Sequence, residues 1–257
     1  MKGYEKTNHI EVLRTFLKIP LGSADGVFNR FLEIPGAIYR GEDLERFLYV
    51  RGDRSNKVLL VAHADTFWDR EYGYDPGPTN EIKIENGEIR AVNDNCGLGA
   101  DDRAGCAMLW LLKDLGHSLL VTNGEEHGQK GATWLMSDNK AIAEEIKQDH
   151  QFVIQFDRRN GGDFKCYDVG ADEFRSYVAE KTGYTEPERR ATTDIVSLCR
   201  KIAGVNLSVG YHNEHHENLI RRDAHRMAQV AKEEVQDRKR NLAGVLQENE
   251  RKAAHRV

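Results

Sequence analysis

The chain has 257 residues, of which 39% are hydrophobic and 31% are charged, and its formal net charge at pH 7 is -5. This length is ample for a hydrophobic core in one large domain or two small ones. The charge balance offers no strongly basic face for nucleic acid, and no apolar run approaches membrane-spanning length. We therefore expect a soluble globular protein with neither a nucleic-acid partner nor a membrane partner.

The first half of the chain begins with a helix and continues with strands. Residues 9–19 have the periodicity of an amphipathic helix, and the apolar segments 46–52 and 57–63 predict neighbouring strands. Asn86-Gly87 lies at the centre of the alternating segment 82–92, which predicts a hairpin.

The second half alternates helices and strands. The pattern predicts, in order, helix 102–116, strand 118–122, helix 130–138, strands 151–157 and 164–170, helices 171–183 and 192–204, and strand 205–210. From about residue 217 onward the sequence is highly charged and predicts a helix. This order predicts an α/β fold, a three-layer sandwich whose mostly parallel central sheet is flanked by helices.

Histidines and carboxylates gather just after the apolar strands and at one helix start. They are His63 and Asp65, Asp101 and Asp102, Glu125 and Glu126, Asp157, and the group His212, His215 and His216. Each piece alone has an ordinary explanation, such as a helix cap, a solvated turn or a surface loop. Because the same chemistry recurs where the strands of an α/β sheet end, the sequence predicts a metal site there. Imidazole and carboxylate ligands suit zinc, cobalt or manganese, and so many candidates favour two ions that share a bridging carboxylate.

Five segments in a fixed order also resemble a known group of enzymes. VAHADT, GLGADDRAG, NGEEHGQKGA, FDRR and VNLSVGYHNEHHEN are similar to the motifs of the di-zinc exopeptidase superfamily, which includes bacterial leucyl aminopeptidases, tripeptidases and glutamate carboxypeptidases. The resemblance covers most of the chain, from about residue 57 to 220. It implies a single zinc-peptidase catalytic domain, which we place at residues 1–240, and the high charge of residues 241–257 predicts a helical or frayed tail.

The resemblance also implies a role for each motif residue. Two divalent metal ions, with zinc favoured over cobalt or manganese, would be held by His63, Asp101, Glu126, Asp157 and His215. Asp101 would bridge both ions. Asp65 would fix the His63 ring from behind, and Glu125 would act as general base and then general acid. Asp102 is interpreted as the cap of the helix that begins beside it.

Two assignments stay open at this point. The last metal ligand is His215 in our preferred alignment, with His216 and then His212 as alternatives. Arg158 or Arg159 could hold a substrate carboxylate, or both could form surface ion pairs.

The spacing after Asp157 bears on domain organisation. Many relatives insert a lid or dimerisation domain between this aspartate and the last histidine, but here fewer than about sixty residues separate them. We therefore expect the compact, leucyl-aminopeptidase-like type without an inserted domain. Residues 66–80, rich in aromatic residues and glycine-proline turns, are a candidate specificity loop.

These observations predict an aminopeptidase acting on short peptides. An N-acyl amino acid deacylase or a carboxypeptidase with the same metal centre is the alternative, and a non-catalytic binding protein of this fold is a third possibility. The polar amino terminus and four cysteines without CxxC spacing favour a cytoplasmic protein with reduced thiols. The oligomeric state is left open.

Overall fold

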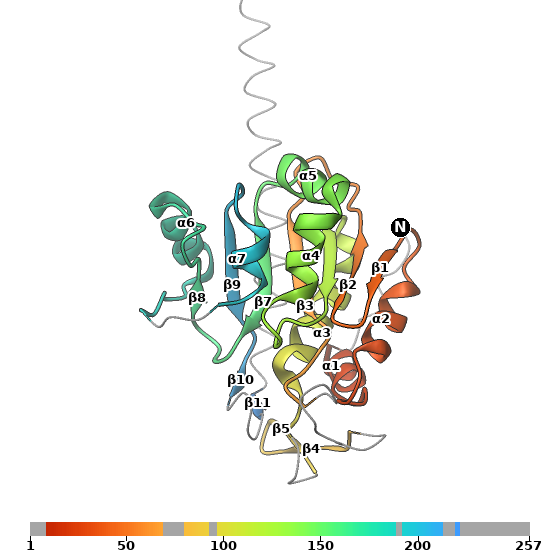
Figure 1. The fold of residues 1–257 in the computed structure, drawn as a ribbon. Coiled ribbons are helices and arrows are strands. Elements are labelled where there is room, and N and C mark those ends of the chain that lie inside the picture. Colours follow the sequence, from red (N-terminus) through yellow and green to blue (C-terminus); the bar gives the residue numbers. More distant parts are fainter. Residues whose placement is uncertain (1–8, 69–79, 93–96, 189–191, 213–218, 222–257) are drawn as a thin grey trace, which may run out of the picture.

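A seven-stranded mixed sheet forms the centre of the computed structural model, which describes residues 9–68, 80–92, 97–188, 192–212 and 219–221. The strand order is β1-β2-β6-β3-β7-β9-β8 (Figure 1). The bounds are Ile38–Glu42 for β1, Glu45–Val50 for β2, Leu59–His63 for β3, Ser118–Thr122 for β6, Val153–Arg158 for β7, Phe164–Lys165 for β8 and Gly204–Ser208 for β9.

The four central strands, β6, β3, β7 and β9, run parallel to one another. The edge strands β1, β2 and β8 pair in the antiparallel sense, which makes the sheet mixed. Every residue of β3 and of β6 is buried, as expected for parallel strands covered on both faces. The predicted α/β sandwich is therefore confirmed, with its parallel part confined to the centre.

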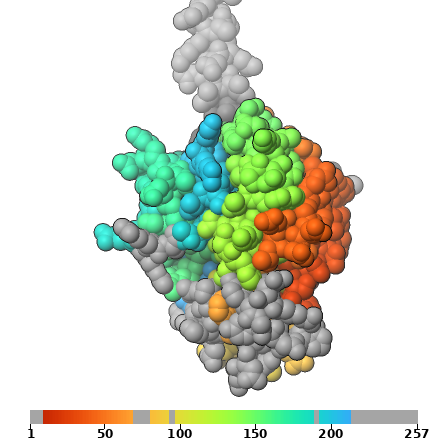
Figure 2. All heavy atoms as spheres, viewed as in Figure 1, coloured from red at the N-terminus to blue at the C-terminus, as the bar shows by residue number. Residues whose placement is uncertain are grey.

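Helices cover both faces of this sheet. One face packs against α1 (His9–Leu17), α2 (Asp25–Leu32) and α3 (Ala100–Leu112), and the other against α4 (Lys130–Asp138), α5 (Lys140–Asp149) and α7 (Asp194–Leu198). Side chains alternate between the two cores, so Leu60 joins the first and Leu59 and Val61 join the second. Figure 2 shows α4 and α5 in light green beside α7 in blue on the second face.

Two edges complete the fold. The helix α6 (Asp172–Thr182) packs near β8 in a small apolar cluster of its own. A second sheet of order β10-β11-β5-β4 lies below the main sheet in Figure 1. Its strands are β4 (Ile82–Glu85), β5 (Glu88–Ala91), β10 (Tyr211–His212) and β11 (Leu219–Arg221). The hairpin prediction is confirmed, because Asn86 and Gly87 turn between β4 and β5 with positive φ angles of 50° and 86°.

Several predicted elements differ in extent. The strand expected over 164–170 is only Phe164–Lys165, since Tyr167 has a φ of 49° that no strand continues through. The helix expected over 192–204 is only Asp194–Leu198, because Cys199 leaves the helical conformation. The helix predicted from about 217 is wrong for residues 219–221, which pair as β11 with β10 and β5. Residues 222–257, and with them the proposed tail 241–257, lie outside the described residues.

The segment between β7 and β10 consists, as far as it is described, of β8, α6, α7 and β9. Because β8 and β9 belong to the main sheet and α7 covers it, the described part of this segment contains no separate inserted domain. Within the described ranges, no helix is both long and apolar enough to cross a membrane. Cys106, Cys166 and Cys199 are buried free thiols.

Candidate metal centre

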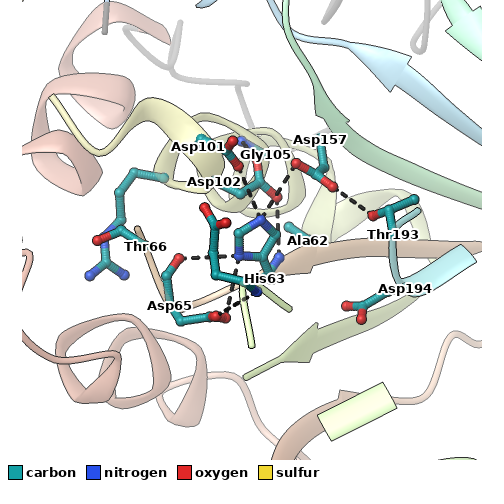
Figure 3. Close-up of polar contacts among 12 residues, drawn as sticks. Ala62, His63, Asp65, Thr66, Asp101, Asp102, Gly105, Asp157, Thr193 and Asp194 are labelled. Atoms are coloured by element: carbon teal, nitrogen blue, oxygen red, sulfur yellow. Dashed lines mark hydrogen bonds and ion pairs between the residues drawn. The ribbon is translucent and has the colours of Figure 1, made fainter. Parts of the chain in front are cut away.

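Three of the predicted ligands meet at the carboxyl edge of the central strands (Figure 3). His63 is the last residue of β3, Asp157 lies near the end of β7, and Asp101 lies at the start of α3. Each offers one ligand atom, and the three atoms lie within 4.8 Å of one another. Because β3 and β7 are parallel neighbours, the sheet itself brings the first two residues together.

The imidazole of His63 is fixed on both sides. Its Nδ1 lies 3.1 Å from the carbonyl oxygen of Asp65 and 3.3 Å from the Oδ1 of the same residue. Its Nε2 lies 3.1 Å from the Oδ1 of Asp101 and 3.4 Å from the Oδ1 of Asp157. If Nδ1–H donates to Asp65, the lone pair of Nε2 faces two carboxylate oxygens. That arrangement is repulsive unless a proton or a metal cation lies among the three atoms, and the nitrogen and oxygen donors are those that zinc accepts.

Asp157 is held so that only one of its carboxylate oxygens faces His63. Its Oδ2 accepts hydrogen bonds from the Nε2 of Gln155 at 2.9 Å and from the hydroxyl of Thr193 at 2.7 Å. Its backbone N–H donates to the side chain of Asn206 at 2.9 Å. The Oδ1 that remains is the atom turned toward the imidazole.

Asp101 and Asp102, joined by a cis peptide bond, point to different partners. Asp102 is fully buried; its Oδ1 accepts the backbone N–H of Gly105 at 2.9 Å, and its Oδ2 accepts that of His63 at 3.1 Å. The first bond caps the helix, as the sequence predicted, and the second ties α3 to β3. Asp101 is thereby presented toward the His63 ring.

Glu125 and Glu126 follow β6, and both are half-buried. The backbone N–H of Glu126 donates to the Oδ2 of Asp65 at 3.1 Å, which ties this loop to the residue behind His63. Burial, together with the nearby carboxylates of Asp157 and Asp194, raises the pKa of Glu125 well above its ordinary value. Glu125 and Glu126 therefore both lie beside the cluster that contains Asp65 and Asp157.

The charges of the cluster act strongly on one another. Burial and the carboxylates of Glu126 and Asp157 raise the pKa of Asp101 to about 8. Burial alone would lower the pKa of His63, but Asp157, Asp101 and Asp65 raise it well above its ordinary value. The metal-free cluster therefore retains protons that a divalent cation would displace.

Two buried residues that we did not single out from the sequence lie beside the cluster, at the start of α7. Thr193 donates to Asp157, and the fully buried Asp194 accepts a hydrogen bond from the hydroxyl of Thr122. Burial raises the pKa of Asp194 to about 7. The signal in the sequence was Thr-Thr-Asp at the start of a predicted helix, which is also an ordinary capping pattern.

Arg103 is a third residue that the sequence interpretation passed over. Its guanidinium is fully buried and donates to the backbone carbonyls of Ala64 at 2.7 Å and of Pro20 and Ser23 at 3.1 Å each. It therefore fixes the chain just after His63.

The remaining predicted residues are placed less directly. Arg158 is buried, and its Nε donates to the Oδ1 of Asp163 at 2.9 Å, so its predicted role in substrate binding stays a prediction. His212 lies in β10, whereas His215 and His216 lie outside the described residues. Most of the candidate specificity loop, residues 69–79, lies outside them as well.

Comparison with known proteins relates this architecture to solved structures alone. The sequence matches no protein-family model and no curated protein. The aminopeptidase PepT from Bacillus cereus is similar with a TM-score of 0.58 and 14% identity, covering 87% of this chain and 97% of its own. A tripeptidase from Staphylococcus aureus is similar with a TM-score of 0.60 and 14% identity, covering 87% of this chain and 96% of its own. The TET1 peptidase of Pyrococcus horikoshii has a TM-score of 0.58 and 17% identity, covering 87% of this chain and 98% of its own.

The chain has the fold of these peptidases. At these identities the likeness shows the fold alone, whereas the resemblance to the di-zinc exopeptidase superfamily rests on the five motifs. The motifs that are described lie along the carboxyl edge of its central strands, where His63, Asp101 and Asp157 converge.

Proposed function

We propose that the protein is a hydrolase with two co-catalytic metal ions that cleaves amide bonds, acting as an aminopeptidase on short peptides. One observation carries this proposal: the Nε2 of His63 faces carboxylate oxygens of Asp101 and Asp157 at 3.1 and 3.4 Å, while Asp65 lies against its Nδ1. The likeness of the fold to aminopeptidases and a tripeptidase supports the same class of reaction.

The ligand assignment follows the motifs. His63 and Asp157 would hold one ion, Asp101 would bridge, and Glu126 with His215 would hold the second. When bound, such ions lower the pKa of a water molecule toward neutrality and polarise the scissile carbonyl. His215 lies outside the described residues, so its part rests on the motif alone.

The other side chains handle protons and orientation. Glu125 would take a proton from the attacking water and return it to the leaving amine. Burial and the Asp157 carboxylate raise its pKa above the ordinary value, which is the direction that favours a carboxylate acting first as base and then as acid. Asp65 would fix the tautomer of His63 through Nδ1.

The surroundings of Arg158 argue against one of the two arginines that could recognise a substrate carboxylate, the other being Arg159. A carboxypeptidase or an N-acyl amino acid deacylase needs a cation for the free carboxylate of its substrate. The Nε of Arg158 already donates to Asp163 at 2.9 Å, so a substrate carboxylate would have to compete with that bond.

The test is digestion of a mixed peptide library by zinc- or cobalt-loaded protein, followed by mass spectrometry. Peptides shortened from the amino terminus would establish the proposal and reveal the preferred side chain. Shortening from the carboxyl terminus, or release of acyl groups from N-acyl amino acids added in parallel, would replace it with the alternative. Absence of cleavage with metal bound would indicate a non-catalytic binding protein.

A variant tests the role of Glu125. We expect Glu125→Gln to lower kcat by about 10²- to 10⁴-fold, the usual contribution of general acid–base catalysis, while metal content stays unchanged. Glu173→Gln, at an exposed position of α6, is the matched control and should keep full activity. Unchanged turnover in Glu125→Gln would remove this residue from the mechanism.

A further inference from the structure

Thr193, which directly precedes α7, and Asp194, its first residue, contact two strands that are not neighbours in the sheet. The hydroxyl of Thr193 donates to the Oδ2 of Asp157 in β7 at 2.7 Å. The carboxylate of the next residue, Asp194, accepts a hydrogen bond from the hydroxyl of Thr122, the last residue of β6. The strand order is β6-β3-β7, so these two contacts flank the strand that ends in His63. Figure 3 shows Thr193 and Asp194 on the same side of the cluster.

A second set of bonds makes the contact with β7 rigid. The backbone N–H of Ile195 donates to the side-chain oxygen of Gln155 at 3.2 Å, and the Nε2 of Gln155 donates to the Oδ2 of Asp157 at 2.9 Å. The same carboxylate oxygen is therefore held both by Thr193 and, through Gln155, by the helix backbone. Rotation of the Asp157 carboxylate would break both bonds.

The contact with β6 involves a buried carboxylate, that of Asp194, which lowers the stability of the fold. Asp194 and Thr122 are both fully buried, and among the described residues the Oδ1 of Asp194 has no hydrogen-bond partner. A buried carboxylate with one unpaired oxygen lowers stability and calls for an explanation. Thr122 lies three residues before Glu125, at the point where β6 leaves the sheet, so its hydroxyl anchors the base of the loop that carries Glu125 and Glu126.

We propose that Thr193 and Asp194 are positioning residues that set the separation between Asp157 and the Glu125–Glu126 pair. The inference rests on the proposed function, because these are the carboxylates assigned to the two ions and to proton transfer. The start of α7 would then hold Asp157 on one side of the candidate centre and the Glu125–Glu126 loop on the other. Neither Thr193 nor Asp194 belongs to the five motifs that the resemblance used.

The first experiment removes one hydroxyl while conserving side-chain volume. We expect Thr193→Val to raise the Kd of the metal-free protein for Zn²⁺ by about 10- to 100-fold, the usual effect of losing a partner that orients a ligand. Chelator competition measures this Kd without any substrate. Thr193→Ser keeps the hydroxyl and should restore most of the affinity. The visible absorption of the Co²⁺-loaded protein should change in Thr193→Val and return in Thr193→Ser.

The matched control uses the same helix. The side chain of Val196, two residues after Asp194, is exposed and takes no part in the contacts with Asp157 or Thr122. Val196→Thr, which keeps the shape of the side chain, should therefore leave the Zn²⁺ affinity unchanged. Thermal unfolding in the presence of chelator, measured for every variant, separates a loss of orientation from a general loss of stability.

A double-mutant cycle tests whether the two contacts act as one device. We expect Thr122→Val to raise the Kd by roughly tenfold and Thr122→Ser to restore it. If α7 holds both strands together, the combined effect of Thr122→Val and Thr193→Val should be smaller than the product of the single effects, because either change alone already frees one of the two strands.

Three results would overturn the inference: wild-type Zn²⁺ affinity in Thr193→Val, failure of Thr193→Ser to restore it, or an equal loss in Val196→Thr. If the effects of Thr122→Val and Thr193→Val simply multiply, the two contacts act independently, and α7 does not hold the two strands as one unit. Because every readout is metal binding, the pattern can hold even if no peptide is cleaved. In that case the proposed function fails and the positioning role stands.

Discussion

The two ends of the central sheet both contain a buried histidine, in opposite chemical settings. Near the amino end of β6, His150 lies with Nε2 2.7 Å from the hydroxyl of Ser118 and Nδ1 3.1 Å from the carbonyl of Ile146. At the carboxyl end, His63 is surrounded by three aspartates. Burial lowers the pKa of His150, whereas the carboxylates raise that of His63 despite its complete burial.

The difference distinguishes a histidine that stabilises the fold, His150, from one that lies in the candidate metal centre, His63. The partners of His150 are neutral, and each of its ring nitrogens lies within hydrogen-bond distance of one of them, so this network stabilises the fold as it stands. Around His63 several acids share a buried space, and they repel one another until a proton or a cation compensates them. A buried histidine therefore signals a metal site through the charge of its partners, and the predictions below test that contrast.

The largest expected effect is on peptide hydrolysis. His63→Gln should lower kcat/KM by more than about 100-fold, because the loss of a direct ligand should exceed that of an outer-shell partner. His150→Gln should stay close to wild type, since it changes only the opposite end of the sheet. The measurement is the initial rate on a peptide identified by the library digestion. Equal losses in both variants would mean that the charged surroundings of His63 give it no special role in hydrolysis.

Metal-linked stability gives the next effect in size. Zn²⁺ at one hundred times its Kd should stabilise the wild type and His150→Gln by about 2.7 kcal/mol against urea unfolding. Asp101→Asn should lose this gain at the same Zn²⁺ concentration, because the Oδ1 of Asp101 is one of the three converging ligand atoms. A full gain in Asp101→Asn would show that zinc binds elsewhere.

Much of the central sheet was predictable because its strands are largely apolar. β3 and β6 are buried throughout and largely apolar, and β7 is apolar up to Asp157 except for Gln155; a motif lies at or just after the end of each strand, and parallel packing makes those ends meet. The short strands depend instead on tertiary pairing. β1 has no buried residue, and β11 is a three-residue strand in a highly charged region, so neither carries a hydrophobic pattern of its own.

The residues of the candidate site likewise fall into a group that the sequence predicted and a group that it did not. His63, Asp101 and Asp157 follow strands or open a helix within recognisable motifs, so sequence order alone placed them together. Thr193 and Asp194 open a helix of only five residues, and their partners lie 36 and 72 positions away in the chain. No local pattern encodes such pairs, because a threonine hydroxyl is common at helix starts whether or not it also orients a ligand.

The smallest predicted effect concerns pH and the amino end of the sheet. Burial, reinforced by Lys57, lowers the pKa of His150 below its ordinary value of 6.5. The folded protein then binds fewer protons there than the unfolded chain, so the contribution of His150 is present above about pH 6.5 and is lost as the pH falls toward the folded pKa.

The measurement is the free energy of unfolding of the wild type and of His150→Gln between pH 8 and 5. Their difference should shrink with falling pH, by about 1.4 kcal/mol for each unit by which the folded pKa is lowered. His63, whose raised pKa gives the opposite sign, is present in both proteins and cancels. A difference that grew toward low pH would mean that His150 is charged within the fold. The contrast between a neutral network at one end of the sheet and a charged one at the other would then lose its basis.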